Sequence, residues 1–297
     1  MKESHKIYGE ALPPEDKKLV VKTLEKWNAE SRGSLKGELN KTPEQFRFIK
    51  DANAWIGREF TELEIEDPPI VAQELIHYLP EEEYKKLGKR QSKTIGVSFS
   101  LENTAYVNIS ACNRLQLFKT TLHEMIHLVS AKAVFVDPKK ATISPYRIGY
   151  DVEHGKSFFH GLNEAVVDKM TLEILKKNWE GLEKSFSVSE EETENNPVTY
   201  YHDYMLILET IIDDLSEHTK ENPEEIWKDF KMGLLTGELM GLRKIERVYG
   251  KGGLRILSLM GQSNDSKEHD AILRKIKRYF SEKDSKNREK IAEKILG

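Results

Sequence analysis

The chain has 297 residues, 38% of them hydrophobic and 32% charged, which is a globular composition with enough apolar residues for one large domain or two small ones. The formal net charge of −4 does not favour a nucleic-acid-binding surface, so we expect no nucleic-acid partner. We expect no membrane partner, because the sequence has no run of about 18 apolar residues. We expect a cytoplasmic protein, because there is no apolar signal segment near the first residue and the single cysteine excludes an internal disulfide.

The first part of the chain contains two predicted helices. Residues 14–30 open with Pro14 and acidic residues and then place apolar residues at helical spacing. Residues 43–58 show the same spacing, and the Asp67-Pro68-Pro69 stretch that follows breaks the pattern. Residues 74–80 are short and predict a strand, and a short helix is expected to start at Pro80.

The middle of the chain predicts a hairpin followed by a helix. Residues 94–100 and 104–110 have β-like composition, and three residues separate them. Residues 114–131 then have the strongest helical pattern of this region. Cys112 lies between hairpin and helix, and its surroundings predict a small buried residue and no nucleophile.

The remainder of the chain is predicted to be a β-ribbon followed by helices. Residues 137–160 contain several Pro and Gly residues and predict a loop or ribbon, and a helix is expected over 162–179. The acidic residues 189–197 predict a solvated linker. From Tyr200 onward the pattern is helical, with breaks expected near Gly241 and at Gly250, Gly252 and Gly253.

These elements predict an α+β fold, with a small antiparallel sheet beside the helix of residues 114–131 and a mostly helical C-terminal half. We expect three parts: an N-terminal helical segment over 1–60, a metal-binding core over 61–180 and a helical C-terminal subdomain over 181–297.

The stretch His-Glu-Met-Ile-His at residues 123–127 carries the chemistry. On a helix, His123 and His127 lie on one face, so both imidazoles can reach one cation, and Zn²⁺ binds neutral imidazole well. Glu124 can reach a metal-bound water and accept its proton. The pattern predicts a zinc site with Glu124 as its general base.

A catalytic zinc site needs a third protein ligand and an open position. The best candidate is Glu164, on the predicted helix 37 residues after His127, and Asp168 lies one turn further along the same face. A carboxylate at Asp168 can accept a hydrogen bond from the far nitrogen of a ligand histidine. The competing third ligand is His154, in a His-Gly-Lys-Ser-Phe-Phe stretch, whereas His160 is expected to be structural or exposed. Ala133 occupies the position where a metzincin would have its third histidine, which excludes that arrangement.

The pair HEMIH and NEAVVD resembles the gluzincin zinc metallopeptidases, the thermolysin-like group that combines HExxH with a downstream NExxD. The resemblance covers roughly residues 94–180, and the GLNEA stretch at 161–165 is similar to one in uncharacterised bacterial proteins of metallopeptidase type. It implies a zincin-like fold, with zinc ligands His123, His127 and Glu164, base Glu124 and supporting carboxylate Asp168. The chain departs from thermolysin in the longer spacing between the two motifs and in having no match to its substrate-binding strand.

Gluzincins often use a Tyr or His from the helical half to stabilise the oxyanion, and this role needs a hydrogen-bond donor besides the metal. Tyr201 and His202 at the start of the C-terminal helical region are the candidates, and Tyr150 is a weaker one. We therefore expect a zinc-dependent hydrolase acting on a peptide or protein substrate. The alternatives are the same chemistry on a non-peptide amide, and a non-catalytic zinc protein that serves as a partner-binding module.

Overall fold

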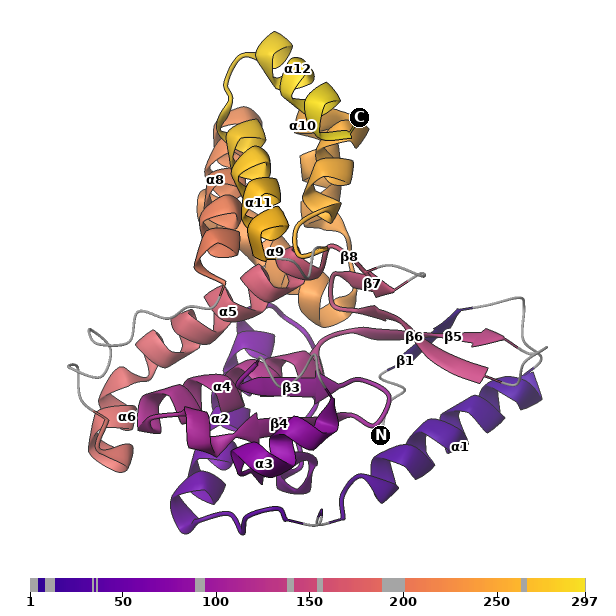
Figure 1. Ribbon diagram of the computed structural model, residues 1–297, viewed down its shortest axis with the longest axis vertical. Helices are drawn as coiled ribbons and strands as arrows, with labels where there is room; N and C mark the ends of the chain where they lie inside the picture. The colour runs from indigo at the N-terminus through magenta and orange to yellow at the C-terminus, as the bar shows by residue number, and fades with distance from the viewer. Residues whose placement is uncertain are drawn as a thin grey trace. The chain divides into compact units, whose positions relative to one another are not determined.

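The computed structural model describes residues 5–8, 14–33, 35, 37–88, 94–137, 142–153, 157–188, 201–262 and 266–296 (Figure 1). They form an α+β fold, as predicted, in which helices predominate over two small sheets. The chain divides into two compact units. The first comprises Met1–Val129, Ala133–Pro145 and Thr171–Pro197, and the second comprises Ser130–Lys132, Tyr146–Met170 and Val198–Gly297.

The N-terminal helices are α1, Pro14–Glu30, and α2, Pro43–Glu62, and both predictions are confirmed. A capping box starts α2, because the Thr42 hydroxyl accepts from the Gln45 N–H while the Gln45 side chain accepts from the Thr42 N–H. Pro43 follows at the first helical position, where its missing N–H costs no helical hydrogen bond.

A three-stranded sheet has the order β2-β4-β3, from β2, Ile76–Leu79, β3, Gly96–Phe99, and β4, Thr104–Asn108. The predicted hairpin is confirmed, since β3 and β4 pair antiparallel with Gly96 opposite Val107. However, β2 joins β4 in parallel, so this sheet is mixed. Between β2 and β3 lies α3, Glu81–Tyr84, and short 3-10 turns occupy Gln73–Leu75, Lys85–Leu87 and Ile109–Ala111.

Helix α4, Arg114–Val129, contacts β3, β4 and α2. A second capping box starts it, formed by reciprocal hydrogen bonds between Asn113 and Gln116. Phe118 of α4 stacks on Phe48 of α2 with ring centroids 4.4 Å apart, and Phe186 at the end of α6, Trp179–Phe186, meets Phe118 edge-on at 4.9 Å. This buried aromatic cluster anchors the helix that carries the HEMIH stretch.

A second sheet has the order β1-β5-β6-β7-β8, and its strands are β1, His5–Tyr8, β5, Lys132–Asp137, β6, Thr142–Ile148, β7, Asp151–Glu153, and β8, Ser157–Phe158. The predicted ribbon is therefore present, with β6, β7 and β8 paired antiparallel in sequence order. Helix α5, His160–Lys177, follows β8 directly.

The helices of the second unit are α8, His202–Thr219, α9, Pro223–Thr236, α10, Met240–Ser258, α11, Ser266–Ser281, and α12, Ser285–Leu296. In Figure 1, α8 and α11 lie side by side, and they are in contact.

The helix break expected near Gly241 occurs slightly earlier, because Gly237 ends α9 with φ of +79° and Gly241 lies within α10. Gly250 interrupts α10 as predicted, with φ of +70°, but the breaks predicted at Gly252 and Gly253 are wrong, because both residues continue the helix. Within the described residues, no helix is long and apolar enough to cross a membrane.

Candidate metal centre

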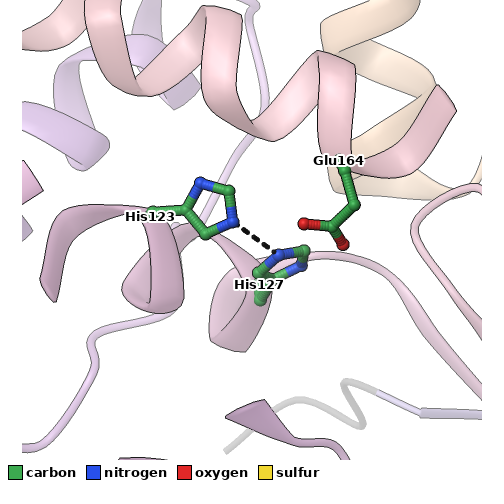
Figure 2. A group of neighbouring side chains, drawn as sticks. All are labelled: His123, His127 and Glu164. Atoms are coloured by element: carbon green, nitrogen blue, oxygen red, sulfur yellow. Dashed lines mark hydrogen bonds between the residues drawn. The ribbon is translucent and has the colours of Figure 1, made fainter. Parts of the chain in front are cut away.

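Helix α4 presents His123 and His127 one turn apart, and Figure 2 shows their rings turned toward each other. Their Nε2 atoms are 3.1 Å apart, and the ring planes are inclined by 70°. Both side chains are buried, at 8% and 7% exposure. The predicted convergence of the two imidazoles is therefore present, with their Nε2 atoms facing each other.

Glu164 of α5 completes a three-residue group. One ligand atom from each of His123, His127 and Glu164 lies within 4.8 Å of the others, and Glu164 is 6% exposed. Figure 2 shows the Glu164 carboxylate directed toward the histidine rings. A buried group of two imidazoles and one carboxylate can hold a metal ion.

The donor set fits a small divalent cation. Zinc–nitrogen bonds of about 2.0–2.1 Å at a tetrahedral angle place two ligand nitrogens about 3.3 Å apart. The separation of the His123 and His127 Nε2 atoms, 3.1 Å, is close to that value. An ion here needs little movement of either ring.

Glu124 is buried on the same helix, at 5% exposure. Its carboxylate lies close to Gly96 of β3, on the outer strand of the three-stranded sheet. Burial raises the pKa of the Tyr84 hydroxyl, and the negative charge of Glu124 raises it further. Glu124 thus sits beside the two histidines with its carboxylate toward the sheet.

The surroundings of Glu164 come from its own helix and from α8. His160, one turn earlier, places Nδ1 3.9 Å from the Glu164 carboxylate and 2.8 Å from Asp151 Oδ2. Burial raises the pKa of Tyr204 on α8, and the charge of Glu164 raises it further. The predicted structural role of His160 agrees with its bond to Asp151.

Tyr204 is a residue that sequence reasoning missed. It is 7% exposed, and its hydroxyl lies 3.0 Å from His269 Nε2. The predicted Tyr201 is half-buried and stacks on the Tyr204 ring at 5.5 Å, whereas His202 is exposed on the first turn of α8. The only sequence signal for Tyr204 is that it lies three residues after Tyr201, on the same helix face.

The other predicted site residues have varied surroundings. Asp168 is 2% exposed and one turn after Glu164, and its role toward a ligand histidine stays a prediction. His154 lies outside the described residues. The Tyr150 hydroxyl donates to the Phe230 carbonyl at 3.1 Å, which is a structural bond.

Cys112 is half-buried, and its thiol donates a hydrogen bond to the Asn108 carbonyl. Burial raises the pKa of the Cys112 thiol to about 12, so the residue is a poor nucleophile.

Comparison of the chain with models of protein families, with curated proteins and with solved structures finds no match. The function of this chain therefore has to be inferred from the site itself.

Proposed function

We propose that this protein is a zinc-dependent hydrolase of gluzincin-like design that cleaves peptide bonds. The observation that carries the proposal is the buried group of His123, His127 and Glu164, with the ligand atoms within 4.8 Å of one another. Catalytic zinc sites use three protein ligands of this kind and leave a position for water or substrate. The resemblance of HEMIH and NEAVVD to HExxH and NExxD supports the same assignment.

A bound zinc ion supplies a positive charge that lowers the pKa of a water molecule and polarises the substrate carbonyl. Glu124 then works as the general base: its carboxylate accepts the proton of the attacking water and returns it to the leaving amine. Its burial beside the two histidines supports this role, because a structural metal site requires no base next to its ligands.

Tyr204 is the best donor for the developing oxyanion. Burial raises the pKa of its hydroxyl, so the group keeps its proton near neutral pH and can donate it in a hydrogen bond. The hydroxyl lies 3.0 Å from His269 Nε2, a contact that limits the orientations open to the Tyr204 side chain. The candidates from the sequence remain the alternatives: Tyr201, the N-cap of α8, and His202, its first residue.

A peptide substrate is favoured by the position of β3. This strand lies at one end of the order β2-β4-β3, so its outer edge has no strand partner among the described residues. An extended peptide can pair with such an edge through backbone hydrogen bonds. Because Gly96 of β3 lies next to Glu124, a peptide on this edge passes close to the proposed base. The arrangement also supports a zincin-like fold.

The test combines metal analysis with a cleavage screen on a peptide library. We expect about one zinc per chain, lost in His123→Ala and Glu164→Gln, and metal-dependent cleavage that Glu124→Gln abolishes while its zinc content stays unchanged. Retention of zinc by Glu164→Gln together with its loss in His154→Ala assigns the third ligand to His154. Stoichiometric zinc without cleavage of any peptide contradicts the proposal and favours the structural zinc site.

A further inference from the structure

Gly96 makes the closest approach of the sheet to the Glu124 side chain. A Cβ atom added at Gly96 would lie 2.5 Å from Glu124 Oε1 and 3.0 Å from Glu124 Cγ. Separations under about 3.0 Å do not occur for real Cβ atoms, so any side chain at this position displaces its neighbours. The Glu124 carboxylate therefore occupies the space that a side chain at residue 96 would fill.

Backbone conformation does not account for this glycine. Gly96 is absent from the residues with positive φ, and it pairs in regular antiparallel register with Val107. A glycine inside a strand costs conformational entropy and packs no side chain, so its use marks a close approach. What Gly96 provides is space.

Thr120 is the second side chain that limits the space at residue 96. It lies one turn before Glu124 on α4, and its Cγ2 atom would be 2.6 Å from a Cβ at residue 96. A β-branched side chain in a helix has few alternative rotamers, so Thr120 cannot easily move away. A methyl group at residue 96 must then push the more flexible Glu124 side chain.

We infer that Gly96 is a positioning residue, whose missing side chain sets where the Glu124 carboxylate lies above β3. The inference rests on the proposed role of Glu124 as the base. Gly96 itself touches no reacting atom; it acts through Glu124. A displacement of a catalytic group by about 1 Å can cost about 100-fold in rate, which is the size of effect expected here.

The first test measures peptide hydrolysis by Gly96→Ala. We expect kcat to fall about 100-fold with KM nearly unchanged and zinc content undiminished, because the base moves while the ligands stay. Gly57→Ala is the matched control, since a Cβ at Gly57 meets nothing within 4 Å. Thr120→Ser removes the Cγ2 atom, so the Gly96→Ala/Thr120→Ser double variant should recover part of the lost kcat. Full activity in Gly96→Ala overturns the inference and leaves the proposed function standing.

The second test needs no activity. We expect Gly96→Ala to lower Tm by a few degrees through overpacking, and Glu124→Ala to remove part of that loss, because one of the two colliding side chains is gone while Thr120 remains. Such non-additivity is the signature of two residues in contact. Equal Tm losses in the two backgrounds overturn the inference even if the protein hydrolyses no peptide. Strongly non-additive Tm changes in a protein that hydrolyses no peptide support the contact between Gly96 and Glu124. In that case only the proposed function is wrong.

Discussion

The side-chain oxygen of Asn163 accepts a hydrogen bond from the backbone N–H of Tyr150 at 2.9 Å. Asn163 is 2% exposed and directly precedes Glu164 on α5. Gly149 permits the approach, with φ of +54°, since a Cβ there would lie 2.4 Å from the Asn163 oxygen. Asn163 therefore holds the first turn of α5, and with it Glu164, against the turn that precedes β7.

Asn163→Ala should weaken both folding and metal binding. The buried Tyr150 N–H loses its acceptor, so the free energy of unfolding, measured with urea, should fall by about 1–3 kcal/mol. Zinc affinity should fall about 10–100-fold, as for other residues that orient a metal ligand. Asn163→Asp keeps an oxygen acceptor and should retain most of both properties. Wild-type stability and zinc affinity in Asn163→Ala would show that the bond does not position Glu164.

Local signals made much of the fold predictable. Helix α1 has the predicted bounds, and the β3–β4 hairpin and α4 lie where periodicity and spacing placed them. The group that could hold a metal ion was also predictable, because two of its members are four residues apart on one helix and Glu164 belongs to a recognisable second stretch. In each case a few adjacent residues carry the information.

Long-range relationships were not predictable. The parallel pairing of β2 with β4 depends on a connection through α3 and β3, which no local pattern describes. The sequence has a glycine at both 237 and 241, and either could end α9. Gly237 ends it by adopting positive φ, whereas Gly241 lies inside α10 against the Phe230 ring. Tyr204 meets His269 across 65 residues of sequence, so this contact depends on tertiary packing.

Zinc should stabilise the folded chain through the three ligands. A ligand at about 100 times its Kd adds about 2.7 kcal/mol to the free energy of unfolding. In a protein of about 150–250 residues this raises Tm by about 5–10 °C. Thermal melts with zinc and with a chelator measure the shift. His127→Ala should abolish it, whereas the control His202→Ala should keep it because His202 is exposed on α8. An unchanged Tm for the wild type with zinc would contradict the metal assignment.

Asp214 should make the helical unit sensitive to acid. Burial tends to raise the pKa of Asp214, but hydrogen bonds from Lys283, at 2.6 Å, and from the Tyr249 hydroxyl more than offset it, so the pKa is lowered. Because the folded pKa lies below the unfolded one, this stability is present above the unfolded pKa and is lost as pH falls through the folded pKa.

Asp214→Asn should therefore lower the free energy of unfolding by about 1–3 kcal/mol near neutral pH, and the difference from the wild type should shrink in strong acid. Urea unfolding over a pH series measures both. Glu217→Gln is the matched control, since Glu217 contacts the same Lys283 at 2.8 Å but is exposed, and it should change stability little. A difference that does not depend on pH would contradict the role of the Asp214 charge.

Lys132 should give the chain a second pH dependence, in the alkaline range. Its side chain is 6% exposed at the start of β5, and burial lowers the pKa of its ammonium group to about 7. An unfolded lysine has a pKa near 10.4, so between these values the unfolded chain binds more protons, and stability rises with pH. Relative to Lys132→Met, the wild type should gain about 2–4 kcal/mol of unfolding free energy from pH 7 to pH 10. The control Lys184→Met removes a lysine that is 78% exposed, and its difference from the wild type should vary much less with pH. A constant difference between the wild type and Lys132→Met over this range would show that the Lys132 ammonium is already as well solvated when folded as when unfolded.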